Sequence, residues 1–243
     1  MSGLSSPAPS SLKSHHLSIE YKHLLSHSPS GVYLLPSPAT PGLFVGVIFL
    51  RRGLYQNGIY KFTLQVPPSY NERGSHPVVT FTTPLLSPLV SDRGVLDMPA
   101  AFPEWDPSRH YLITALTYVK KLFYIKSFSL GPAVGGDLLG SSAASLSLPG
   151  FANPDALELH ATDPAGYAAA VKESVQASQE AVYANRGEGD FQFVKQGGGG
   201  EHDLFRAFLL KELERQEEGK EGGGKVGAEG VLGCVKMASA KKL

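Results

Sequence analysis

Few residues in this chain of 243 have the type and spacing that covalent or metal chemistry needs. Cys234 is the only cysteine, and it lies in a stretch rich in Gly and Lys near the C-terminus. A single thiol cannot form a disulfide within the chain, which fits a reducing compartment. The eight histidines lack the grouping of a zinc site, and we interpret His15, His16, His23 and His27 as the solvated face of a helix. No metal ion or other cofactor is therefore expected.

The composition argues against several other classes of function. Lys plus Arg equals Asp plus Glu, at 22 each, so no positive surplus is available to neutralise nucleic-acid phosphates. The apolar run from Leu43 to Leu50 is far shorter than the roughly 20 residues of a membrane-spanning helix. Gly197 to Gly200 form a linker and not a phosphate loop, because no strand precedes them and no Lys-Ser or Lys-Thr follows. We expect a cytoplasmic protein without nucleic-acid binding or direct membrane insertion.

The N-terminal half predicts a helix followed by an antiparallel sheet. Residues 1–11 are rich in Ser and Pro and are expected to be disordered, whereas 12–28 form an imperfect amphipathic helix. Asn57-Gly58, a strong hairpin signal, separates two apolar runs. Four strands are predicted, at 32–35, 43–51, 59–66 and 78–82, and the third alternates as a half-buried strand does. Together these segments predict a four-stranded meander.

The C-terminal half predicts helices joined by irregular segments, which makes the fold class α+β. Residues 84–107 contain five prolines and form a long irregular loop. A well-buried central helix is predicted over 109–128, followed by a flexible insertion of Gly, Ser and Ala at 129–150. Two helices follow, one starting at Asn153-Pro154 and one capped by Thr162 or Asp163 and running to about residue 184.

We place the domain at residues 12–185, and an extra segment follows it. It consists of a Gly-rich linker at 186–200, an amphipathic helix at 201–218 and a disordered tail at 219–243. The helix carries an apolar stripe and is the candidate partner-binding surface. The stripe consists of Leu204, Phe205, Phe208, Leu209 and Leu213. It either packs on its own domain or docks in a groove of a partner protein.

The order of these elements, together with several short motifs, resembles the ubiquitin-conjugating-enzyme fold. Leu54 to Phe62 resembles that family's Tyr-x-Gly-Gly hairpin and the strand after it, and Val66 to Tyr70 its Phe-Pro-x-x-Tyr turn. His76 to Thr83 resembles the Pro-Pro-x-Val-x-Phe-x-Thr strand, and Trp105-Asp106-Pro107 the Trp-x-Pro before the central helix. Each motif alone is unspecific, but their shared order identifies the fold.

The resemblance does not extend to the active-site residues of the conjugating enzymes. The family's His-Pro-Asn corresponds here to Ser87-Pro88-Leu89. Its catalytic cysteine corresponds to Asp97 when counted from Leu89, or to Val95 when the local sequence is aligned. Conjugation requires a thiolate that accepts ubiquitin and benefits from the asparagine amide. The resemblance therefore implies a pseudoenzyme with no catalytic residue.

Among inactive variants, the chain is most similar to the fused-toes or AKT-interacting protein family. Gly94 to Asp97, then Trp105, then a Tyr-rich helix from Tyr111 to Tyr124 carry this resemblance. It implies an adaptor that joins a Hook-like coiled coil and an FHIP-like subunit and links vesicles or early endosomes to dynein. The alternative is a module that binds ubiquitin or assists a conjugating enzyme. An enzyme with an unusual nucleophile remains a third hypothesis.

Overall fold

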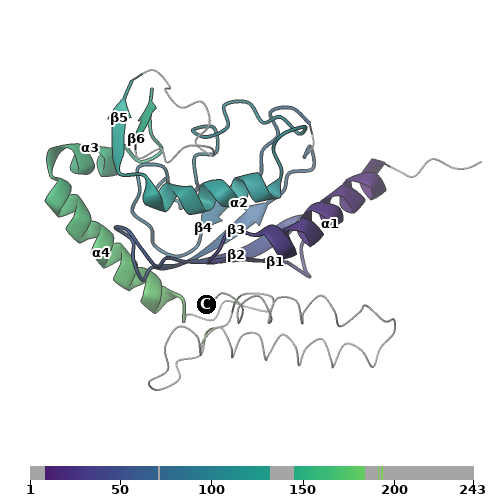
Figure 1. Cartoon of the computed structure of the whole chain (residues 1–243), viewed down its shortest axis with the longest axis horizontal. Helices are drawn as coiled ribbons and strands as arrows, with labels where there is room; N and C mark the ends of the chain where they lie inside the picture. The colour runs from purple at the N-terminus through teal and green to yellow at the C-terminus, as the bar shows by residue number, and fades with distance from the viewer. Residues whose placement is uncertain (1–8, 71, 132–144, 184–190, 192, 194–243) are drawn as a thin grey trace, which may run out of the picture. The chain divides into compact units, whose positions relative to one another are not determined.

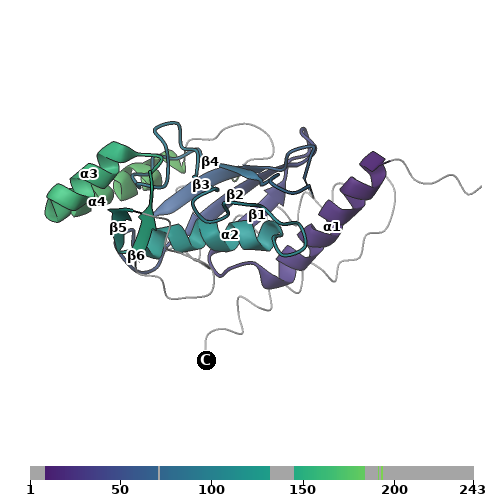
Figure 2. The ribbon, with the colours of Figure 1, turned by 90° about the horizontal axis from the view of Figure 1, so that it is seen from above.

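The computed structural model describes residues 9–70, 72–131, 145–183, 191 and 193. All described helices and strands lie in the first of the two units into which the chain divides, Met1–Asp190. They form an α+β domain in which one helix crosses a face of a four-stranded sheet and the others lie at its two ends (Figures 1 and 2). The predicted fold class is confirmed.

The sheet is an antiparallel meander in the order β1-β2-β3-β4, as predicted. Its strands are β1 (Val32–Pro36), β2 (Leu43–Phe49), β3 (Ile59–Gln65) and β4 (Val78–Phe81). The predicted hairpin is present, and Asn57 adopts the left-handed conformation with a φ of 69°. Alternate residues face the core; they include Val32, Leu34, Phe44, Ile48, Tyr60, Phe62, Leu64, Val79 and Phe81. Gly46 allows close packing here, because a Cβ would overlap the Phe62 ring.

Two helices frame this core, and both differ from their predicted bounds. Helix α1 spans Pro9–His27, so it starts within the stretch expected to be disordered. Helix α2 spans Leu112–Lys121 and continues as a 3-10 turn, η1 (Leu122–Tyr124). The prediction of one helix over 109–128 is therefore wrong at both ends. Asp106 to His110 form a turn at the start, and at the other end the chain becomes extended and enters a strand.

That strand, β5 (Ser127–Leu130), pairs in parallel with β6 (Ser145–Leu148). The prediction of a flexible insertion over 129–150 is therefore wrong at both ends of the segment. These two segments form strands because alternate side chains are buried. Leu146 is only 2% exposed, and Phe128 packs edge-on against Phe151 with ring centres 5.8 Å apart.

The last two described helices are α3 (Pro154–Thr162) and α4 (Pro164–Ala181), and both begin with the predicted caps. The Asn153 side chain accepts a hydrogen bond from the Ala156 N–H at 2.9 Å, and Asp163 accepts one from the Gly166 N–H at 2.8 Å. Strand β3 is buried on both faces over Ile59 to Phe62, where the sequence predicts a half-buried strand. Helix α4 contacts it there, since the Ile59 N–H donates to Ser178 Oγ at 3.3 Å.

Candidate functional site

The segment Ser87-Pro88-Leu89, predicted to correspond to the His-Pro-Asn of conjugating enzymes, is buried. Ser87 and Leu89 are both 0% exposed, and Ser87 Oγ accepts a hydrogen bond from the Leu89 N–H at 3.3 Å. The Pro88 carbonyl accepts a hydrogen bond from the N–H of Asn153 at 3.0 Å. Because Asn153 caps α3, the start of this helix closes over the segment. A leucine suits such a site, where an unpaired amide would be costly.

Asp97, one of the two residues predicted to correspond to the catalytic cysteine of conjugating enzymes, lies beside Leu89. The Asp97 N–H donates to the Leu89 carbonyl at 2.9 Å. Its carboxylate accepts a hydrogen bond from the Ala100 N–H at 3.2 Å, and its carbonyl accepts one from the Tyr118 hydroxyl at 3.0 Å. Burial, and then the charge of Asp97, raises the pKa of Tyr118, so this hydroxyl stays protonated. Asp97 is thus part of a tight turn.

Val95, the other alternative, occupies a different place. It is 37% exposed and forms a β-bridge with Thr80, beside the edge of β4. The turn before it requires Gly94, which has a φ of 79° and leaves no room for a Cβ against the Phe81 carbonyl. The structure therefore brings Leu89 and Asp97 into direct contact, while Val95 belongs to a bridge with the sheet.

A buried tyrosine pair holds the start of this loop. The Tyr55 hydroxyl donates to the Leu86 carbonyl at 2.8 Å and lies 3.0 Å from the hydroxyl of Tyr167 on α4. The Leu86 N–H donates to Ser174 Oγ at 3.2 Å. Burial raises the pKa of Tyr55 well above its ordinary value, with a further contribution from Tyr167. The sequence gives no clear signal for this pair, because 112 residues separate its members.

A pocket of about 260 Å³ opens beside Asp97. Its walls are mostly apolar, with Pro99 and Pro103 on one side and Leu146 to Gly150 of the β6 region on the other. Small-molecule sites usually measure about 300–1,000 Å³, so this pocket is small for a cofactor. Ser147 is its one hydroxyl, and its one carboxylate, Asp97, accepts a hydrogen bond from the Ala100 N–H. The pocket can accommodate an apolar group.

Other predicted features have simpler outcomes. Trp105 is 0% exposed and packs against Phe102, as expected of a core residue. The apolar stripe on 201–218 and Cys234 lie outside the described residues. In the part of the chain that the structure describes, no three His, Cys, Asp or Glu residues are grouped to hold a metal ion. No helix of that part is long and apolar enough to cross a membrane.

Comparison with known proteins gives clear relatives. No family model matches. The chain is 32% identical to Protein crossbronx of Drosophila virilis over 165 residues, covering 68% of this chain and 62% of that protein. It is 38% identical to Protein AKTIP homolog of Nematostella vectensis over 109 residues, which are 44% of this chain and 36% of the relative. It is 36% identical to human AKT-interacting protein over 106 residues, 43% and 36% of the two chains. The matched regions therefore span less than two thirds of each relative.

Proposed function

We propose that this chain, a relative of the fused-toes family of crossbronx and AKT-interacting proteins, is a non-catalytic adaptor that binds other proteins. One observation supports the proposal: Leu89, aligned with the asparagine of a conjugating enzyme, is joined by a backbone hydrogen bond of 2.9 Å to Asp97, which with Val95 is one of the two alternatives for its cysteine. The loop with Leu89 and Asp97, which would be catalytic in a conjugating enzyme, packs here against the rest of the domain.

The side chains present support this proposal on chemical grounds. A carboxylate such as Asp97 is a poor nucleophile towards a thioester, and its product would be a labile anhydride. Leu89 has no amide to steady a developing oxyanion. Cys234 is the only thiol in the sequence, and it lies 137 positions beyond Asp97. We therefore expect no side chain at this site to accept ubiquitin as a thioester.

The partners we propose are proteins. The resemblance implies a Hook-like coiled coil and an FHIP-like subunit, with the complex linking vesicles or early endosomes to dynein from the cytoplasm. Several relatives are named AKT-interacting protein, which says that those proteins interact with AKT. For this chain, we propose that the stripe of Leu204, Phe205, Phe208, Leu209 and Leu213 contributes to partner binding, since an apolar helical face must be buried.

A charging assay tests the absence of catalysis. The full chain is incubated with ubiquitin, activating enzyme and ATP, beside an active conjugating enzyme as positive control. We expect no adduct that reductant or base removes. A Cys234→Ser variant is the matched control, because an adduct on the tail thiol would disappear in it. An adduct that persists in Cys234→Ser and is lost in Asp97→Asn would refute the proposal.

Affinity purification from the protein's own cells, followed by mass spectrometry, tests the partners. We expect Hook-like and FHIP-like proteins with the full chain, and their loss when the chain is truncated after Gln196. Phe208→Asp should reproduce the loss, whereas Glu214→Lys, which lies off the stripe, should not. Recovery of ubiquitin or an active conjugating enzyme in their place would favour a role in the ubiquitin pathway.

A further inference from the structure

His23 and His27 form a stacked pair on the exposed surface of α1. Their ring centroids are 4.0 Å apart and their planes differ by 7°. Residues four apart on a helix are neighbours on one face, which places both imidazoles over the same spot. The sequence pattern predicts only a solvated face here, and both residues are indeed exposed. The stacking is information that only the structure supplies.

A hydrogen bond determines which nitrogen of His27 is available to a ligand. Nδ1 of His27 lies 3.1 Å from the carbonyl oxygen of His23. A carbonyl oxygen only accepts, so Nδ1 carries the proton and Nε2 keeps its lone pair. Histidines that bind metals usually have this arrangement, in which the second nitrogen donates to a backbone carbonyl or a carboxylate. The hydrogen bond therefore leaves Nε2 as the nitrogen of His27 that is open to an ion.

We propose that His23 and His27 together bind a divalent transition-metal ion, Zn²⁺ or Cu²⁺, through one ring nitrogen each. Zinc–nitrogen bonds of about 2.0–2.1 Å at a tetrahedral angle place two ligand nitrogens about 3.3 Å apart. In the stack the two ring planes are nearly parallel, so their in-plane lone pairs do not meet, and the rings must turn out of the stack to bind one ion. Two histidines four residues apart on one helix face bind zinc together in the His-Glu-x-x-His motif. Imidazole suits both metals, and Cu²⁺ binds more tightly than Zn²⁺ to such ligands.

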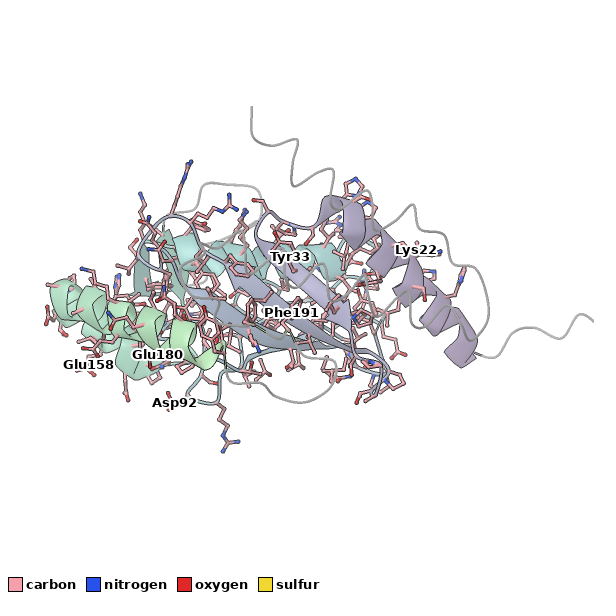
Figure 3. All side chains as sticks on the ribbon, turned by 90° about the horizontal axis from the view of Figure 1, so that it is seen from below. Lys22, Tyr33, Asp92, Glu158, Glu180 and Phe191 are labelled. Carbon is pink, nitrogen blue, oxygen red and sulfur yellow. The ribbon has the colours of Figure 1, made fainter. Side chains whose placement is uncertain are left out.

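The site is open and holds its ion through two protein ligands. Glu20 on the same helix does not add a third, because its Oε2 accepts hydrogen bonds from the Tyr70 hydroxyl at 2.8 Å and the Leu112 N–H at 2.9 Å. Helix α1 projects from one end of the sheet, and Lys22 lies on its surface (Figures 2 and 3). Water or a ligand from another molecule completes the coordination, so the ion exchanges readily.

Titration of the full chain with Zn²⁺ and Cu²⁺, in competition with a chromophoric chelator, tests the site. Every variant carries Cys234→Ser, because a free thiol would also bind these metals. We expect one ion per chain at this site, bound more tightly for Cu²⁺, and a weakening of about tenfold or more in His23→Ala or His27→Ala. The double variant His15→Ala/His16→Ala is the matched control. It removes two imidazoles from the same helix, but adjacent residues do not face each other, so the affinity should be retained.

Two results would overturn the proposal. One is equal affinity in His27→Ala and the parent chain, and the other is an equal loss in the His15→Ala/His16→Ala control. Far-UV circular dichroism of each variant checks that the helices remain folded. His27→Gln, which has a higher helix propensity and no imidazole, separates ligand loss from helix loss and should bind as weakly as His27→Ala.

Discussion

Removing a single hydroxyl tests how the loop at the degenerate site is held. Tyr55→Phe deletes the hydroxyl that bonds to the Leu86 carbonyl and to Tyr167, at 2.8 and 3.0 Å. The ring itself stays in place, packed edge-on against Phe123 with centroids 5.2 Å apart. Tyr60→Phe is a matched control. Tyr60 is 0% exposed, and its ring lies 5.1 Å from the same phenylalanine. Its hydroxyl makes no hydrogen bond of good geometry within the described residues, although the Ser174 and Ser178 hydroxyls lower its pKa slightly against the effect of burial.

The two variants should differ clearly in the free energy of unfolding. A buried hydrogen bond contributes about 0.5–1.5 kcal/mol net, and a buried polar group left unpaired costs about 1–3 kcal/mol. Tyr55→Phe leaves the Leu86 carbonyl and the Tyr167 hydroxyl each without this partner, so we expect a loss of about 2–3 kcal/mol. Tyr60→Phe removes a hydroxyl that makes no hydrogen bond of good geometry within the described residues, and we expect a change within about 0.5 kcal/mol or a small gain.

Urea unfolding followed by tryptophan fluorescence measures this difference, since Trp105 is the only tryptophan and lies in the core. The urea midpoint should fall in Tyr55→Phe while the slope stays that of the parent chain. Equal losses in the two variants would refute the reasoning, because both remove one phenolic oxygen from the same aromatic cluster. A loss below about 0.5 kcal/mol in Tyr55→Phe would show that the loop is held by other contacts.

Three further predictions follow from the same contacts. Glu20→Ala should lower the free energy of unfolding by about 2–4 kcal/mol, since it removes the charged acceptor of the Tyr70 hydroxyl and the Leu112 N–H. Glu20→Gln should lose less stability. Equal urea midpoints for Glu20→Ala and the parent chain would contradict this prediction. Burial raises the pKa of Tyr60 to about 12, and an unfolded tyrosine ionises near about 10. The stability due to this shift is complete below about pH 10 and is lost as the pH rises towards about 12. At pH 11 the parent chain should therefore have lost about 1.4 kcal/mol more than Tyr60→Phe, which urea unfolding at pH 8 and 11 would measure. Asp97→Cys should form no ubiquitin thioester in the charging assay, because Leu89 still lacks the amide; a reductant-sensitive adduct would contradict this.

Most of the fold follows from local signals in the sequence. Asn57-Gly58 between apolar runs indicates the hairpin, and Asn153 and Asp163 indicate the helix starts, because each acts on neighbouring residues. The start of α2 was harder to predict. Its first N–H is bonded to Glu20, 92 residues earlier, so no local pattern reveals the helix boundary.

Strands β5 and β6 could have been found from the sequence. Both segments alternate serine with an apolar residue, Ser-Phe-Ser-Leu at 127–130 and Ser-Leu-Ser-Leu at 145–148. This period of two predicts a strand, but the surrounding Gly and Ser residues favoured a flexible loop. Residues of β6 line the pocket beside Asp97. The prediction of a flexible loop therefore also missed this part of the pocket wall.

Motif spacing leads us to propose a degenerate site at Ser87 to Leu89 with Asp97 or Val95, but it could not show how these residues pack. A catalytic thiolate must be reachable by a large partner, whereas Ser87 and Leu89 are completely buried and Asp97 uses its carboxylate to cap a turn. Restoring the thiol alone would remove that cap without opening the loop. The loop and the strands beside it therefore present a fixed surface with a small apolar pocket. Such a surface offers an apolar contact to a partner protein, and this is the physical basis on which we propose binding.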